Sequence, residues 1–147
     1  MKQGTFESRI FIRSTVEKTL SLARAYERHH NFHPLIVKVD VEPNPPVGVL
    51  KRYFITDQLQ WGPFRFKIKY RADILSVSKN DFRTEAYQSP GTTVLNHTTV
   101  TPTDDGVTLG ETITLRAPSL LFGYAFQQAK QAHAEMLKRL KDWLEAQ

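Results

Sequence analysis

The chain contains no cysteine. Without thiols it cannot form disulfides, use a cysteine nucleophile or bind a metal through thiolates. A chain without cysteine fits a reducing compartment, and a cytoplasmic location is the expectation, although exported proteins also lack cysteine in many cases.

Long hydrophobic runs are absent as well. No stretch approaches the roughly 20 apolar residues that a membrane-spanning helix needs. Met1 to Thr5 leads directly into a polar, alternating segment, so we expect no signal peptide. With 147 residues, of which 24% are charged and 40% hydrophobic, the sequence has the size and composition of a single globular domain spanning residues 1–147.

The sequence also has no dense cluster of charge. The net charge is +5, which permits anionic partners such as nucleic acid. Lys and Arg are spread along the chain or alternate with apolar residues, which is typical of a solvated protein face. A nucleic-acid partner is therefore not expected.

What the sequence does contain is a long amphipathic segment at its end, from Pro118 to Ala146. Pro118 suits a first helical position because its missing N–H has no partner there, and Ser119 or Ala117 is the expected N-cap. The opposite face is polar, from Gln127 to Glu145. The apolar stripe recurs at helical spacing and comprises Phe122, Ala125, Phe126, Ala129, Ala132, His133, Met136, Leu137, Leu140, Trp143 and Leu144.

Most of the preceding chain alternates between apolar and polar residues, as strands do. Short turns, including the Asp-Gly hairpin signal at Asp105–Gly106, separate the segments. On the fourth strand, Phe64, Phe66, Ile68, Tyr70, Ala72 and Ile74 should face inward, and Arg65, Lys67, Lys69, Arg71 and Asp73 should face water. The seven expected strands are 5–13, 35–42, 49–59, 64–76, 82–88, 93–101 and 107–115.

Between the first two strands, two short helical pieces are expected. Ser14 to Glu17 reads as a capping box, in which Ser14 accepts from the Glu17 N–H. The first helix should run to about Glu27 and the second piece to His33, where Pro34 ends it. The order of elements predicts an α+β fold with a curved antiparallel sheet wrapped around the long C-terminal helix.

This order, and several local features, resemble the SRPBCC/START-like proteins, in particular the polyketide cyclase/dehydratase-like group. The resemblance starts with the capped helix and the element Asn31-Phe32-His33-Pro34-Leu35-Ile36. It continues more loosely through Gly62–Phe66, Asn96–Thr98 and Glu111–Leu115. It implies a helix-grip fold with a deep apolar cavity that binds a lipid, polyketide or isoprenoid-like molecule. Some members of the group cyclise or dehydrate polyketides, and others are ribosome-associated, so the fold leaves the function open.

Glu111 and His133 are the candidate polar groups of that cavity. Glu111 shares a strand face with Leu109 and Ile113, where a carboxylate needs a partner, and Arg52, Tyr70, His97 or His133 are candidates. His133 lies in the middle of the helix stripe. A glutamate–histidine pair could orient a ligand, or serve as acid and base in a cyclase/dehydratase-type reaction. Simple burial with a hydrogen bond is the plainer alternative for both.

Two other sets of histidines are less decisive. Asn96 and His97 point to opposite faces of the sixth strand, and the alternation does not decide which one faces inward. His29, His30 and His33 are spaced so that two of the three imidazoles could share one helical face. A metal needs a further ligand in suitable geometry, and none is evident, so we expect no metal and no cofactor.

Together these observations favour a binding module over an enzyme, with a homodimer left open. A basic face formed by Lys51, Arg52, Arg65, Lys67, Lys69 and Arg71 leaves ribosome or RNA association as a further alternative. The expected ligand-binding residues are Phe66, Ile68, Tyr70, Glu111, Ile113, Phe126, Ala129 and His133.

Overall fold

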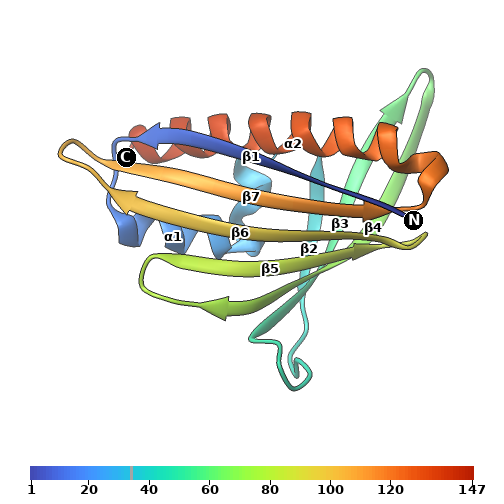
Figure 1. Cartoon of the computed structure of the whole chain (residues 1–147), viewed down its shortest axis with the longest axis horizontal. Coiled ribbons are helices and arrows are strands. Elements are labelled where there is room, and N and C mark those ends of the chain that lie inside the picture. Colours follow the sequence, from blue (N-terminus) through green and yellow to red (C-terminus); the bar gives the residue numbers. More distant parts are fainter. Residues whose placement is uncertain (34) are drawn as a thin grey trace.

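A computed structural model describes residues 1–33 and 35–147, without the side chains of Gln60 and Trp61. One curved antiparallel sheet of seven strands packs against a long C-terminal helix, α2 (Figure 1). Pro34, which was expected to end the second helical piece, lies outside the described residues.

The sheet follows the chain from strand to strand. Its order is β1-β7-β6-β5-β4-β3-β2, so strands β2 to β7 neighbour each other in sequence and β1 pairs with β7. Short connections favour this antiparallel arrangement. The α+β helix-grip fold that the sequence predicts is confirmed. The strands are β1 (Lys2–Ile12), β2 (Ile36–Val41), β3 (Lys51–Trp61), β4 (Phe64–Val77), β5 (Asp81–Gln88), β6 (Thr92–Pro102) and β7 (Val107–Ala117).

The first helix is capped one residue later than expected. α1 (Val16–Arg24) has Thr15 at its N-cap, and the Thr15 hydroxyl accepts a hydrogen bond from the Lys18 N–H at 3.1 Å. The predicted cap at Ser14 is therefore wrong. A 3-10 helix, η1 (Tyr26–Asn31), replaces the expected last turn of α1 and forms the second helical piece.

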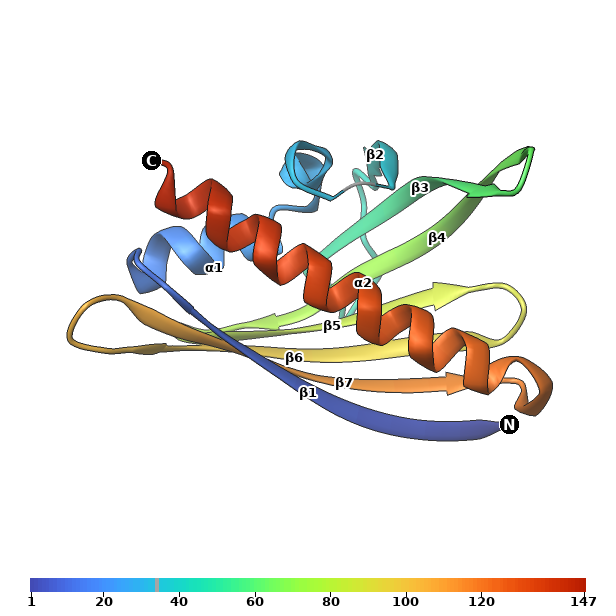
Figure 2. The ribbon, with the colours of Figure 1, turned by 90° about the horizontal axis from the view of Figure 1, so that it is seen from above.

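The helix α2 (Ser119–Glu145) crosses the sheet obliquely (Figure 2). Pro118 is its N-cap residue, with a ψ of 139°, and not its first helical residue as predicted. The buried residues of the helix, Leu137, Leu140 and Leu144, all lie in its C-terminal half. The N-terminal half is only partly covered, with Leu120 and Tyr124 exposed.

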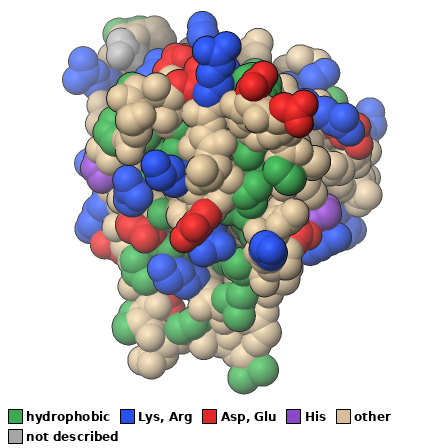
Figure 3. All heavy atoms as spheres, turned by 90° about the vertical axis from the view of Figure 1, so that its left-hand side faces the viewer, with side chains coloured by type: hydrophobic (Ala, Val, Ile, Leu, Met, Phe, Trp, Pro, Cys, Tyr) green, Lys and Arg blue, Asp and Glu red, His purple; other side chains and the backbone are tan. Residues whose placement is uncertain are grey.

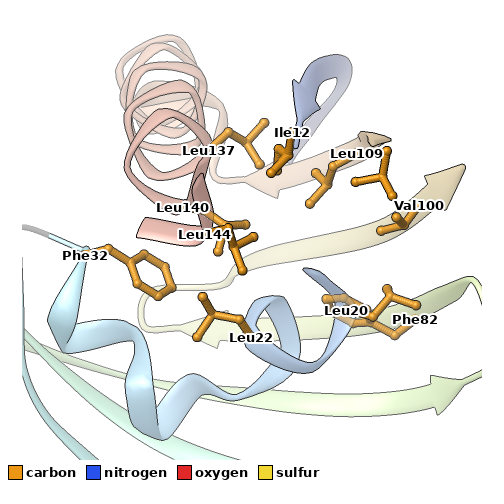
Figure 4. Packing of buried hydrophobic residues seen from close by; sticks show 11 residues of the cluster. Ile12, Leu20, Leu22, Phe32, Phe82, Val100, Leu109, Leu137, Leu140 and Leu144 are labelled. Atoms are coloured by element: carbon orange, nitrogen blue, oxygen red, sulfur yellow. The ribbon is translucent and has the colours of Figure 1, made fainter. Parts of the chain in front are cut away.

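The hydrophobic core is divided into two clusters. The larger one joins the C-terminal half of α2 to α1, β1 and strands β5 to β7, and includes Leu20, Leu109 and Leu140 (Figure 4). The smaller one lies on β2 to β4 and is built from Ile36, Tyr53, Ile55, Ala72 and Ile74.

A buried carboxylate, Asp73, lies on the outer face of the sheet. Asp73 on β4 was expected to face water, but its side chain is only 5% exposed. Arg52 on β3 forms two hydrogen bonds with it, at 2.8 and 2.9 Å, and Arg71 lies 3.4 Å away. Arg52 is thus the partner of Asp73 and not of Glu111.

Candidate functional site

A cavity of about 490 Å³ lies between α2 and the inner face of the sheet. Its lining draws residues from both core clusters, from η1 and from the partly covered half of α2. Its apolar wall includes Leu35, Ile36, Leu59, Ile68, Ala72, Phe82, Ala86, Val94, Leu109, Leu115, Met136, Leu137 and Leu140. A cavity of this size and character is typical of small-molecule sites.

Small residues on α2 leave this space open. Ala125, Ala129 and Ala132 all line the cavity, at the helical positions that face the sheet. One turn further on, the larger Met136, Leu137 and Leu140 fill the same face and close the core. The residue sizes along one helix therefore determine where the protein is hollow.

Polar side chains meet on the wall formed by β6, β7 and α2. The Asn96 amide donates a hydrogen bond to Glu111 Oε2 at 2.8 Å, and His133 Nδ1 lies 3.1 Å from the same oxygen. The Thr98 hydroxyl donates to the Asn96 side-chain oxygen at 3.3 Å. The Glu111 side chain is 2% exposed, and these contacts give its Oε2 the partners that a buried carboxylate oxygen requires. His133, one of the four candidate partners of Glu111, is therefore in contact with it.

Strand register explains why these groups converge. Thr98 on β6 lies opposite Glu111 on β7, and Asn96 lies two residues further along the same face. His97 consequently points to the outer face, where its Nε2 lies 2.8 Å from Asp81. The structure thus decides the open question on β6: Asn96 faces the cavity and His97 does not.

A second polar group lies on the wall formed by β3 and β4. Asp57 and Tyr70 both line the cavity, and each shifts the pKa of the other. Burial raises the pKa of Asp57 to about 6, against the smaller lowering effect of Tyr70. Burial and the Asp57 charge raise the pKa of Tyr70 well above its usual value.

The region of η1 contributes a third set of polar groups. Burial raises the pKa of Tyr26 to about 12, against a smaller lowering effect of Thr84 on β5. Burial also lowers the pKa values of His29 and His33 to about 4. His29 Nε2 faces the carbonyl oxygens of Leu22 and Ala23 at 3.1 and 3.0 Å. Both histidines line the cavity as neutral imidazoles.

The expected ligand-binding residues divide into two groups. Ile68, Tyr70, Glu111, Ala129 and His133 line the cavity. The other three do not belong to its lining, for the reasons that follow.

Phe66 lies near the β3–β4 turn, opposite Leu59, and it is 43% exposed. Phe126 packs edge-on against Phe6 on β1, with ring centroids 5.5 Å apart, and stacks on Phe122. Ile113 is fully buried in the sheet between Phe6 and Asn96. An inward-facing pattern therefore identified the cavity wall only in part.

Sequence reasoning missed Asp57, Tyr26 and Thr84. A signal for Asp57 was present, because it alternates in phase with Tyr53, Ile55 and Leu59 on the inner face of β3. Tyr26 carried no comparable signal, since its position depends on the 3-10 geometry of η1.

Among the described residues, no group of three or more His, Asp or Glu side chains is arranged to hold a metal ion. His29 is turned toward backbone carbonyls, and the His30 Nδ1 lies near the Glu27 carbonyl. The described part of the chain also contains no helix that is both long and apolar enough to cross a membrane.

The sequence matches no family model, and a search of curated proteins finds no match. Solved structures with the same fold are numerous. The di-domain ARO/CYC protein StfQ from the steffimycin biosynthetic pathway is 15% identical with a TM-score of 0.79, covering 98% of this chain and 51% of that one. This chain thus spans about half the length of StfQ.

Two other similar structures match along their whole length. Ara h 8.0201 is 15% identical with a TM-score of 0.78, covering 99% of this chain and 100% of that one. A START superfamily protein from Mycobacterium smegmatis is 11% identical with a TM-score of 0.77, covering 97% of each chain. The chain therefore has the helix-grip fold of SRPBCC/START-like proteins.

Proposed function

We propose that this protein binds a small, mainly hydrophobic molecule in the cavity between α2 and the sheet. The observation that carries the proposal is the cavity itself, about 490 Å³ in volume, with a mainly apolar wall and the Asn96–Glu111–His133 cluster inside it. Apolar walls supply affinity, and a few placed polar groups fix orientation. The fold shared with a START superfamily protein supports this reading.

Filling the cavity tests the proposal. Ala129→Trp places a large ring where the helix faces the cavity, whereas Ala134→Trp places it on the exposed face of the same helix. We expect the fluorescent probe N-phenyl-1-naphthylamine to bind the wild type and the Ala134→Trp variant, and to bind Ala129→Trp at least about tenfold more weakly. Equal affinity for all three proteins would place the probe outside the cavity.

Native mass spectrometry of the gently purified protein provides an independent test. A bound molecule that is lost on denaturation, and that the Ala129→Trp variant does not carry, would support the proposal and give the mass of the ligand. Bound mass that both tryptophan variants retain would contradict it.

Catalysis is the second candidate, and the contact between Glu111 and His133 favours it. With Glu111 ionised, His133 donates its Nδ1–H to the carboxylate and has its lone pair on Nε2, as a general base requires. Such a base could remove a proton from carbon next to a carbonyl group, leaving the electron pair on the enolate oxygen. StfQ, which shares the fold, is an ARO/CYC protein of a biosynthetic pathway.

Deuterium exchange separates catalysis from binding. In D₂O, a catalytic pair would accelerate exchange at the α-carbons of 2-undecanone, followed by NMR, and Glu111→Gln or His133→Ala would abolish the acceleration. If the wild type binds the ketone without accelerating exchange, the protein is a binding module for ketones of this kind.

A further inference from the structure

The charges of the cavity wall are of one sign. Among the described lining residues there are two carboxylates, Asp57 and Glu111, and no Lys or Arg. This contrasts with the chain as a whole, whose net charge is +5. His29 and His33 add no positive charge at neutral pH, because burial keeps both imidazoles neutral.

Both carboxylates have an oxygen that lacks a partner within the described residues. Asn96 and His133 both approach Oε2 of Glu111, and no described side chain donates to Oε1. Asp57 Oδ1 is buried without a hydrogen bond. A buried acceptor left unsatisfied costs about 1–3 kcal/mol, which applies to Asp57 Oδ1. The two carboxylates on the cavity wall are therefore suited to a donor brought by a ligand.

A negatively charged ligand group finds no Lys or Arg among the described lining residues. A carboxylate or phosphate entering the cavity would lose its hydration without gaining a cation, and it would face Asp57 and Glu111. A hydroxyl or ammonium group could instead donate a hydrogen bond to either carboxylate.

We therefore propose that the ligand is an amphipathic molecule whose polar group donates hydrogen bonds and carries no negative charge, either a hydroxyl or an amine. The proposal rests on the proposed binding function and defines the ligand class. It excludes fatty acids and phosphate-bearing lipids as the preferred ligands.

Competition against N-phenyl-1-naphthylamine at pH 7.5 tests the proposal, using 1-dodecanol, dodecylamine and dodecanoic acid as matched competitors. The three differ only in the polar end. We expect half-displacement by the alcohol or the amine at concentrations at least about tenfold below that of the acid.

The variant Asp57→Asn distinguishes an amine ligand from an alcohol ligand. If the ligand is an amine, the variant should lose about tenfold in affinity for dodecylamine and change its affinity for dodecanol by less than about twofold. If the ligand is an alcohol, dodecanol should remain the tighter competitor in both proteins. Asp40→Asn, on the outer face of β2 next to Lys38, is the matched control and should alter neither value.

The outcomes separate this proposal from the function on which it rests. If the probe binds and dodecanoic acid competes as well as the other two, the proposed ligand class is wrong and binding stands. If neither the probe nor any competitor binds, as confirmed by calorimetry, the binding function itself fails. The wild-type comparison is decisive even if Asp57→Asn does not fold.

Discussion

At the scale of single residues, the buried histidines should make stability depend on pH. The pKa values of His29 and His33 are about 4 in the folded protein and near 6.5 in the unfolded chain. The unfolded chain therefore binds protons first as pH falls, and the free energy of unfolding decreases from pH 6.5 downward. Asp57 acts in the opposite direction below about pH 6, because its pKa is raised in the folded state.

The effect of the two histidines exceeds that of the one aspartate, so the free energy of unfolding decreases overall as pH falls. We expect the free energy of unfolding to fall by about 2 kcal/mol between pH 6.5 and 5.0, and by less than half of that in His29→Gln. The glutamine amide can still donate to the Leu22 and Ala23 carbonyls. Urea titrations at several pH values measure both slopes, and identical slopes would show that His29 is not the titrating group.

Asp73 provides a second prediction at this scale. Its carboxylate is bound by Arg52 and lies close to Arg71 on the outer face of the sheet. Removing it leaves two partly exposed guanidinium groups without their counterion, so Asp73→Ala should lower the free energy of unfolding by about 1–3 kcal/mol.

Asp40→Ala is the natural comparison, because Asp40 pairs with Lys38 where both side chains are more than half exposed. Such exposed pairs contribute about 0–1 kcal/mol. Chemical denaturation of the two variants compares them directly, and an equal loss in both would mean that Asp73 is not held by its arginines.

At the scale of elements, the cap of α1 is the contact that the sequence left ambiguous. Thr15→Ala removes the hydroxyl that accepts from the Lys18 N–H and should cost about 1 kcal/mol. Ser14→Ala should change the free energy of unfolding by less than about 0.5 kcal/mol, since Ser14 is not the cap. Thermal or urea unfolding of the pair tests the assignment, and the reverse order would restore the predicted capping box.

Alternation and helical spacing were sufficient to predict seven strands and the long closing helix. They failed where the phase is ambiguous, as at Asn96 and His97, or where two neighbouring residues can both cap a helix, as at Ser14 and Thr15. Asp73 shows another limit. Its burial depends on Arg52, a cross-strand neighbour whose register no local pattern reveals.

At the scale of the molecule, the fold could be predicted but the cavity wall only in part. Ile68, Glu111, Ala129 and His133 line it because inward strand and helix faces converge there. Phe66, Ile113 and Phe126 share those inward faces without reaching the cavity, since the helix covers the curved sheet unevenly along its length. Where a helix crosses a sheet is a property of the whole molecule, and single-segment patterns do not contain it.

Whether the basic face binds a partner is also a question about the whole molecule. Arg52 and Arg71 are engaged with Asp73, which leaves Arg65, Lys67 and Lys69 as the exposed cations of the outer β4 face. On the end of the molecule where α1 and the β6–β7 turn lie, acidic and basic side chains are interspersed (Figure 3).

Three phosphate contacts imply weak and salt-sensitive binding to RNA. For single-stranded RNA we expect log K to fall with log salt at a slope of about −2, with no retention at about 0.2 M NaCl. Fluorescence anisotropy with a labelled oligonucleotide measures the slope. The double variant Lys67→Glu, Lys69→Glu should remove the residual binding and leave the affinity for N-phenyl-1-naphthylamine unchanged, because neither lysine lines the cavity. Micromolar RNA binding that persists at about 0.2 M salt would instead make the basic face a functional surface of the protein.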